Sequence, residues 1–551
     1  MVAVGTVGTV GTDGESWLDP RPRAAGHALA ARPRPGTRRK LVLFDNSKMS
    51  APYERGRPIR NAMHEVLQRM GSVTIEYSDL LIEPAADNAA RVARWVADGV
   101  DGVVFGYCDA GVTQPTLTHA AAAEKAGIPT VVLCNDQVID LAATCAGFLA
   151  PGLPLVCLEA SRLAAPQELH DAAVAAADAV RQALEADPKV LLAEALARFP
   201  YTASLARSGT DGAKEPAAPR REPFAEFALA NRMTDGLPVV TPTAPRVAAM
   251  LKAVGAAGND DRVLVPLLAP SGAPLTLRQA AISAVMAGCT PPRFPLVLAA
   301  IEAMSDPAYR LILANITTHP SGNLIVFSGP AAKAAGVSSG RGCMGPGNEA
   351  NLTIGRAITL AFINAARAIP GLSVLSPFGS PAQLSICFAD TAGGPFEDLA
   401  TQLAGPGESV VWVHKVESPH CVADHISSKP EPLLDTIASV AVTLGGNSAY
   451  MPSDLLVVLN PEHADIFKRA GWTRRDVQHY LWQHARVPRA RITGRGVKPE
   501  HPAEWSRWDM LPVALAPERI WIIVAGVGGP QSMVTVPWGY AHAVWRKIPA
   551  G

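Results

Sequence analysis

The stretch DGVVFGYCDAGVTQPTLTHAAAAEKAGIPTVVLCN, residues 101–135, decides the predicted fold of the first part of the chain. The apolar run at 103–105 indicates a strand, the Ala-rich segment after it favours a helix, and the Gly-Ile-Pro turn at 127–129 precedes a second apolar strand. Strand-helix-strand units of this kind build parallel α/β sheets. Cys108 is therefore expected at the carboxyl end of the first strand, and Cys134 at that of the second.

This position predicts a reactive thiol at Cys108. Open α/β sheets bind ligands outside the carboxyl ends of their strands, and the amino terminus of a following helix supplies N–H dipoles that favour a thiolate. The competing interpretation is that cysteine serves as a small buried apolar residue, which must hold for most of the eight cysteines in the chain. We expect Cys108 to be a reactive, catalytic cysteine, and Cys134 is a second candidate on the same rim of the sheet.

Residues 40 to 168, approximately, resemble the UGSC-type domain, named for a selenocysteine-Gly-Ser-Cys motif, with Cys108 at the selenocysteine position. The segment is more distantly similar to the selenoprotein subunit of the glycine, sarcosine and betaine reductases. The resemblance implies a soft nucleophile that attacks carbon or sulfur and is regenerated by reduction. Here Asp109-Ala110 stands for Gly-Ser, and Gly111 stands for the resolving cysteine. Either Cys134 resolves the intermediate, or the chemistry is nucleophilic without net redox.

Composition excludes several other classes of protein. Lys plus Arg and Asp plus Glu each number 49 among 551 residues, so no charge excess points to nucleic acid or to a membrane surface. No uninterrupted apolar run reaches the length of a membrane span, which is about 18 residues or more. Irregularly spaced cysteines and the lack of a secretory signal predict free thiols in a reducing cytoplasm.

Changes in composition along the chain divide it into four predicted parts. Residues 1–39 are predicted to be a flexible leader and 40–203 a Rossmann-like parallel α/β sandwich with trailing helices. The polar, Gly- and Pro-bearing stretch at 204–223 is predicted to be a linker, and 224–551 a larger α/β or α+β region.

Polar residues near the predicted strand ends extend the candidate site around Cys108. The strand KLVLFDNSK ends in Asp45, Asn46 and Ser47, which a parallel sheet would place near Cys108. Asp45, Asp109 and His119 are candidates for moving a proton, although His119 lies about three turns along the helix. The remaining candidate, Tyr107, precedes the cysteine and is expected to contact substrate.

The second region carries the patterns TDGLPVV at 234–240, AVMAGC at 284–289 and GPGNEANLTIGRA at 345–357. These patterns are similar to a large uncharacterised bacterial family whose members often accompany or fuse to UGSC-type domains. The resemblance covers nearly all of 224–548. It implies an association with such domains and no particular reaction.

A glycine-rich loop followed by a long helix predicts an anion site in this region, because free N–H groups at the helix start would face the loop. The helix is expected to begin near Asn351, and Cys343 is a candidate to receive an intermediate. The alternative is a crossover that lets two helices pack, since neither a P-loop nor a dinucleotide fingerprint is present. The anion-site candidates are Arg341, Gly342, Gly345, Gly347, Asn348, Asn351 and Arg356, and Thr318 and His319 join them from a separate polar loop that also holds Asn315.

Two further clusters have ordinary explanations. His420, Cys421 and His425 offer potential metal ligands without a second ligand pair, so no metal site is predicted. The run at 471–486 predicts an amphipathic helix capped by Thr473. A buried strand near the C-terminus is expected to pair with LSICFAD and LLVVLN in one sheet.

The leading hypothesis is a cofactor-free, cysteine-dependent enzyme acting on a small, anionic substrate by reductive cleavage, lyase or transfer chemistry. The alternative is a binding or carrier protein whose first domain is degenerate and which captures an organic acid or acyl ligand. Expected partners are a small-molecule substrate and, for redox chemistry, a thiol reductant or redox protein. The sequence leaves oligomer formation open.

Overall fold

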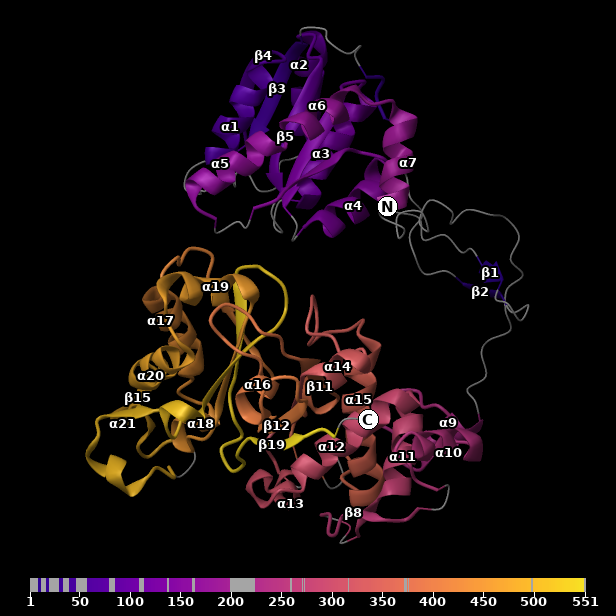
Figure 1. The fold of residues 1–551 in the computed structure, drawn as a ribbon, viewed down its shortest axis with the longest axis vertical. Coiled ribbons are helices and arrows are strands. Elements are labelled where there is room, and N and C mark those ends of the chain that lie inside the picture. Colours follow the sequence, from indigo (N-terminus) through magenta and orange to yellow (C-terminus); the bar gives the residue numbers. More distant parts are fainter. Residues whose placement is uncertain are drawn as a thin grey trace. The chain divides into compact units, whose positions relative to one another are not determined.

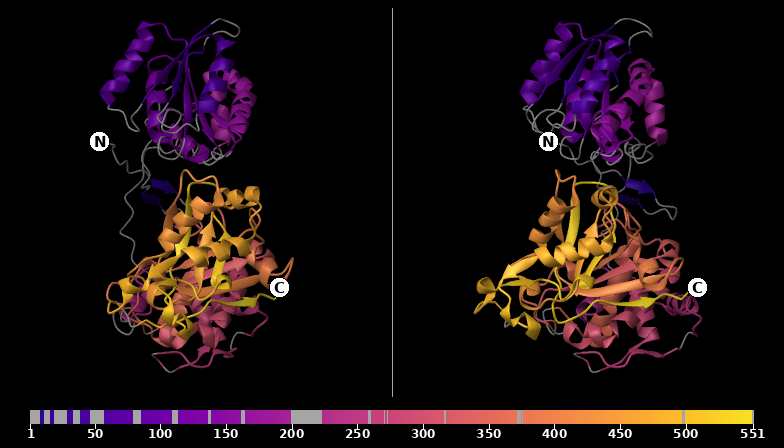
Figure 2. Two further views of the ribbon diagram at one scale, coloured as in Figure 1. Left: turned by 90° about the vertical axis from the view of Figure 1, so that its left-hand side faces the viewer. Right: turned by 60° about the vertical axis from the view of Figure 1, so that its left-hand side comes forward.

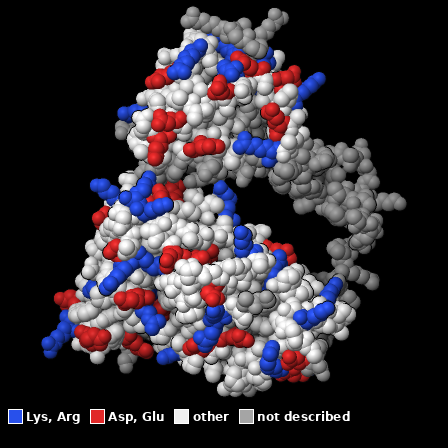
Figure 3. All heavy atoms as spheres, viewed as in Figure 1, with Lys and Arg blue, Asp and Glu red and all other residues white. Residues whose placement is uncertain are grey.

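The chain folds into two compact units, residues 1–219 and 220–551. The structure is a computed structural model, and it describes residues 8–10, 16–18, 29–32, 39–45, 57–78, 85–108, 113–135, 138–160, 164–198, 223–257, 260–269, 271, 273–315, 317–370, 374, 376–496 and 499–549. On the face shown in Figure 3, basic and acidic side chains are interspersed, as the equal numbers of the two kinds lead one to expect.

A five-stranded, all-parallel sheet forms the centre of the first unit (Figure 1). Strand order reverses between β3 and β5, because β3 is followed along the chain by β4 on one side and by β5 on the other. Open sheets bind ligands at the carboxyl ends of strands next to such a switch point. In spatial order the strands are β4 (Gly71–Tyr77), β3 (Arg39–Asp45), β5 (Gly102–Cys108), β6 (Thr130–Asn135) and β7 (Leu155–Leu158).

Helices cover both faces of this sheet (Figure 2). Side chains of a strand alternate between faces, so Leu41 and Leu43 pack on one layer while Val42 and Phe44 pack on the other. Strands buried on both faces are continuously apolar, which is the pattern that the sequence shows. The first layer holds α1 (Arg57–Gln68), α5 (Pro166–Ala175) and α6 (Ala177–Glu185), and the second holds α2 (Ala85–Ala97), α3 (Thr113–Lys125) and α4 (Ile139–Leu149); α7 (Pro188–Arg198) follows.

Two four-stranded sheets with flanking helices form the second unit. The first has the order β11 (Ile386–Ala389), β10 (Gly322–Ser328), β12 (Val410–Val416), β19 (Val544–Lys547), and the second the order β13 (His420–Ala423), β18 (Gln531–Thr535), β14 (Leu455–Leu459), β17 (Ile520–Val524).

Separate groups of helices contact the two sheets of this unit. Against the first sheet lie α12 (Phe294–Met304) and α15 (Glu349–Ala361), with α11 (Leu277–Met286) packed on α15; against the second lie α17 (Pro430–Ala441), α19 (Pro461–Ala470) and α20 (Arg474–His484). Shorter helices are α9 (Pro223–Ala230), α10 (Ala244–Lys252), α13 (Leu311–Ala314), α14 (Pro330–Ala334), α16 (Leu399–Ala404), α18 (Asn447–Tyr450) and α21 (Arg489–Ile492). Short strand pairs are β1 (Gly8–Val10) with β2 (Ser16–Leu18), β8 (Val263–Val265) with β9 (Leu275–Thr276), and β15 (Arg486–Pro488) with β16 (Met510–Pro512).

The predicted fold class, a parallel α/β sandwich followed by a larger α/β region, is confirmed. The predicted cap at Thr473 is also confirmed, since its side chain accepts a hydrogen bond from the Asp476 N–H. No described helix is long and apolar enough to cross a membrane.

One local expectation was wrong. The C-terminal strand β17 pairs with LLVVL, but the ICFA strand lies in the other sheet, so the unit has two sheets instead of one. Helix α15 begins at Glu349, near the expected start at Asn351. His420 and Cys421 lie in the strand β13.

The predicted linker lies outside the described residues up to Glu222, and α9 begins at Pro223. Within the predicted flexible leader, residues 29–32 contact α3. Arg32 donates to both carboxylate oxygens of buried Glu124, at 2.7 and 2.8 Å, and the Ala30 N–H donates to the same carboxylate. This short segment is therefore held to the first unit.

Candidate functional site

Cysteines stand side by side on three neighbouring strands of the first unit. Cys108 of β5 is the register partner of Cys134 of β6, which is in turn the partner of Cys157 of β7. Register partners on adjacent parallel strands face the same side of a sheet and lie about 4.8 Å apart. Cys108, Cys134 and Cys157 therefore form a row of sulfurs near the carboxyl edge, which we call the cysteine row.

A register shift in β5 brings Cys108 into line with the other two cysteines of the row. Phe105 pairs with Val132, so a regular strand would place Tyr107 opposite Cys134 and turn Cys108 to the other face. The ladder instead shifts between Phe105 and Cys108, which brings Cys108 level with Cys134. An extra residue of this kind is a β-bulge, and a glycine inside a strand, here Gly106, often marks one.

Two sulfurs of the row, those of Cys108 and Cys134, are in hydrogen-bond contact, and both side chains are fully buried. The hydrogen bond with Cys108 raises the pKa of Cys134 well above its ordinary value, and burial and the nearby Cys108 and Cys157 raise it further. Cys134 is therefore a protonated thiol at neutral pH. On α4, burial first and then Cys108 raise the pKa of Cys145. All eight cysteines of the chain are thiols and not disulfides.

Asp45 ends β3 next to β5, but its side chain leaves the opposite face of the sheet. It has the same alternation as Leu43, which packs on the α1 layer, and it accepts a hydrogen bond from Arg60 of α1 at 3.0 Å. Burial raises the pKa of Asp45 to about 6, although Arg60 acts in the other direction. The strand end lies beside that of Cys108 as expected, whereas the carboxylate is directed to α1.

The remaining candidates around Cys108 are only partly described. His119 of α3 is buried, with its ring edge against Phe44 at 5.9 Å between centroids. Helix α3 begins at Thr113, five positions after Cys108. Asn46, Ser47 and Asp109 lie outside the described residues, and so does the side chain of Tyr107.

The predicted anion loop of the second unit is held by its own polar side chains. Buried Asn351 donates to the carbonyls of Ser338 and Cys343, at 2.9 Å each, and accepts from the Ser338 N–H at 2.8 Å. Asn348 donates to the Gly342 carbonyl at 3.0 Å. These bonds close the loop around the start of α15, and they use the side chains of Asn348 and Asn351, two of the residues that were expected to meet an anion.

Cys343 of the same loop is buried. Burial raises its pKa, although backbone N–H groups, that of Gly526 first, act in the other direction. Gly342 and Gly347 have positive φ angles of 68° and 104°, so the chain needs glycine there to turn, while Gly345 does not. Arg341 is exposed.

Arg356 binds the TDGLP turn and not the loop. Its guanidinium donates to both Asp235 carboxylate oxygens, at 2.7 and 2.8 Å, and to the Pro238 carbonyl at 2.8 Å. An incoming anion would have to displace this bidentate ion pair. The observed contacts match the alternative of a packing crossover better than a ready anion site.

In the polar loop before β10, Thr318 is exposed and His319 contacts the Glu417 carboxylate at 3.2 Å through Nε2. Asn315 and Ser321 of the same loop instead line a small cavity together with Lys415. Sequence reasoning missed Lys415. The available signal was a lysine inside VVWVHKV, a strand that is otherwise suited to full burial.

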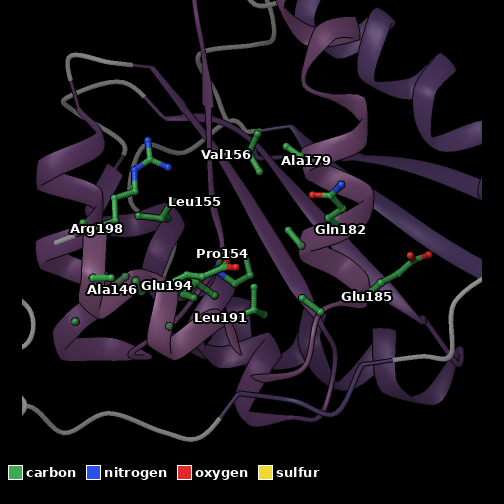
Figure 4. A pocket seen from close by; sticks show the side chains of 18 residues that line it. Ala146, Pro154, Leu155, Val156, Ala179, Gln182, Glu185, Leu191, Glu194 and Arg198 are labelled. Atoms are coloured by element: carbon green, nitrogen blue, oxygen red, sulfur yellow. The ribbon is translucent and has the colours of Figure 1, made fainter. Parts of the chain in front are cut away.

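A large cavity of the first unit lies away from these thiols. It has a volume of about 950 Å³ and opens at the amino end of β7, with walls from α4, α6 and α7. Figure 4 shows Pro154, Leu155 and Leu191 beside the polar side chains of Gln182, Glu194 and Arg198. The cysteine row lies toward the carboxyl ends of the strands, so this cavity does not hold it.

Comparison with known protein families finds a match in the first unit. Residues 16–186 match the UGSC family. The chain therefore contains a UGSC-type domain. That domain spans the whole parallel sheet, the cysteine row and helices α1 to α6. The match covers none of residues 224–551. A search of curated proteins finds no match to the chain.

Proposed function

We propose that the UGSC-type domain is a thiol-dependent catalytic domain in which Cys108 attacks an electrophilic carbon or sulfur of a small substrate. The observation that carries the proposal is the contact of the Cys108 and Cys134 sulfurs at the carboxyl end of β5, next to the β3–β5 switch point. Paired thiols at a place where open sheets bind ligands are suited to nucleophilic and redox chemistry.

In this proposal Cys134 is the partner of the nucleophile. Its raised pKa keeps Cys134 protonated, so its S–H can donate a hydrogen bond to a thiolate that forms at Cys108. The Cα atoms of neighbouring parallel strands lie about 4.8 Å apart, inside the range of about 4.4–6.8 Å found for disulfides. Cys134 can therefore act as the resolving thiol, in place of the motif position that Gly111 occupies here.

The reductive cleavage that we propose has two steps, in which atoms and electrons balance. The Cys108 thiolate displaces X⁻ from R–X and forms a thioether-like S–R bond, with the released proton going to X. Cys134 then gives up its proton as its sulfur attacks the Cys108 sulfur, the S–R electron pair leaves with R, and R takes that proton. Two thiols and R–X thus give R–H, HX and one disulfide, which a dithiol reductant or redox protein must reduce. The first step alone is the non-redox, transfer form of the same chemistry.

Burial of Cys108 favours the alternative function, a binding or carrier protein whose first domain is degenerate and has no catalytic activity. A buried sulfur meets a substrate only if neighbouring groups move. Free thiols throughout the chain suit a reducing cytoplasm under either function.

Disulfide mapping tests the role of Cys134. The full-length protein is treated with a mild oxidant and digested without reduction, and crosslinked peptides are identified by mass spectrometry. We expect a Cys108–Cys134 crosslink as the first product, lost in Cys134→Ser and retained in Cys157→Ser. A Cys134–Cys157 crosslink that forms first, or at the same rate in Cys108→Ser, would assign the redox pair elsewhere and remove the resolving role from the Cys108 mechanism.

A further inference from the structure

A small cavity in the second unit carries polar groups that the thiol chemistry does not use. Its volume is about 70 Å³, and it lies among β10, β12, the loop after α13 and the end of α15. By the space that single waters occupy, it has room for about five water-sized groups. The polar residues that line it are Lys415, Asn323, Asn315, Ser321, Thr359 and Gln383.

Lys415 is a buried cation of β12, only 6% exposed. It stands opposite Asn323 of β10, and its Nζ donates to the Asn323 side-chain oxygen at 3.0 Å. The same oxygen accepts the Tyr309 hydroxyl at 2.7 Å, which uses both of its lone pairs. An ammonium has three donors, so Lys415 retains donors for another acceptor. No carboxylate is found among the described residues that line the cavity.

Two further polar groups face the same space. Asn315 and Ser321 are 6% and 0% exposed. The Asn315 Nδ2 and Ser321 Oγ atoms are buried without a hydrogen-bond partner among the described residues. Unpaired buried polar groups are unfavourable, and those in a native protein call for water or a ligand. Together with Lys415 they bring three kinds of donor to the lining of one small cavity.

Another part of the lining is apolar. Phe362, Ile363 and Val374 contribute side chains, with Ala314 and Ala368 between them. A ligand that satisfies both parts of the lining has an anionic acceptor group at one end and a short hydrocarbon tail at the other. Inorganic phosphate fits the donors but leaves the apolar wall without a partner.

We infer that this cavity is a binding site for a short-chain carboxylate, whose carboxylate group pairs with Lys415 and accepts hydrogen bonds from Asn315 and Ser321. Burial lowers the pKa of Lys415 to about 8, so the side chain is still mainly protonated at neutral pH. The volume admits ligands of the size of acetate, propionate and butyrate. This site belongs to the second unit and does not depend on the function proposed for Cys108.

Calorimetric titration of the full-length protein with acetate, propionate, butyrate, hexanoate and phosphate tests the inference. We expect saturable binding of the short carboxylates, strongest for propionate or butyrate, and little binding of hexanoate or phosphate. Lys415→Met keeps the length of the side chain and removes the charge, and should weaken binding at least about 10-fold. Ser321→Ala should weaken it several-fold. The control Lys468→Met, an exposed lysine of α19, should leave affinity unchanged.

Equal affinity of wild type and Lys415→Met for propionate would overturn the inference, and so would the absence of saturable binding for every carboxylate. Preference for phosphate would reject the carboxylate class. If Lys415→Met does not fold, as judged by circular dichroism, Ser321→Ala and Asn315→Ala decide. Undiminished propionate binding in both of those variants would place the ligand elsewhere.

Discussion

At the scale of single residues, this protein buries several ionisable groups whose protonation is set by their immediate contacts. Asp45 is buried against the α1 layer, and among the described residues Arg60 is its one charged partner. Asp454 is buried too, but hydrogen bonds from His542 and Trp521 outweigh the effect of burial and lower its pKa to about 2. The pKa values of these two buried carboxyl groups thus shift in opposite directions, because in the described part of the chain that of Asp45 has a single hydrogen-bond partner and that of Asp454 has several.

Asp45 predicts a pH dependence of stability. Its pKa rises from 3.8 to about 6 on folding, so between these values the folded protein binds more protons than the unfolded chain. The free energy of unfolding should therefore fall as pH rises from about 4 to about 6, by about 1–3 kcal/mol from this residue. Asp45→Asn should lose that dependence, which urea unfolding at a series of pH values would measure.

Asp390 of the second unit also has its pKa raised to about 6, because it is buried. The comparison must therefore be the difference between wild type and Asp45→Asn at each pH, with Asp390→Asn as the matched control. Parallel curves for wild type and Asp45→Asn would show that Asp45 ionises normally in the folded protein.

At the scale of elements, side chains far apart in the sequence join helices to loops. Arg356 of α15 binds Asp235, which lies 121 residues earlier, and the pair is mostly buried. A planar guanidinium with two parallel bonds holds one geometry, which fixes the TDGLP turn against the helix. The glycine loop is held more locally, by hydrogen bonds from the Asn351 side chain to the Ser338 and Cys343 carbonyls.

We expect Arg356→Lys to destabilise the second unit by about 1–3 kcal/mol, because lysine cannot form the bidentate pair. Asp235→Asn should have a similar effect. A double-mutant cycle measured by urea unfolding should give a coupling energy of about 1–3 kcal/mol. The exposed pair Arg278 and Asp261 is the control, with an expected coupling below about 1 kcal/mol. Additive effects at Arg356 and Asp235 would contradict the proposed clamp.

At the scale of the whole molecule, the pattern of apolar residues and the positions of glycine, proline and polar residues were enough to predict the parallel sheet of the first unit. Strands and helices alternate there, and each strand end is marked by polar or cysteine residues. Sheet membership in the second unit was not predictable in this way. The β11 and β17 strands are both short and apolar, and their placement in different sheets depends on long-range pairing that leaves no local pattern.

The site was predictable to a similar degree. Alternation places Cys108 and Cys134 at strand ends, but the face on which Cys108 lies depends on the register shift after Phe105. The roles expected of Asn351 and Arg356 depended on glycine-rich local sequence, whereas their observed partners are tertiary contacts. Lys415 could have been noticed, since a charged residue in a buried strand needs a reason.

The most direct test of the account is the rate of alkylation of each cysteine by iodoacetamide in the folded, full-length protein, followed by peptide mass spectrometry. Cys421 is exposed and serves as the reference thiol. We predict that Cys108 reacts faster than Cys421 in spite of its burial, and that Cys134→Ser slows Cys108 while Cys387→Ser does not. If Cys421 reacts first and Cys108 reacts only when the protein is unfolded, Cys108 is a core residue and the catalytic proposal is wrong.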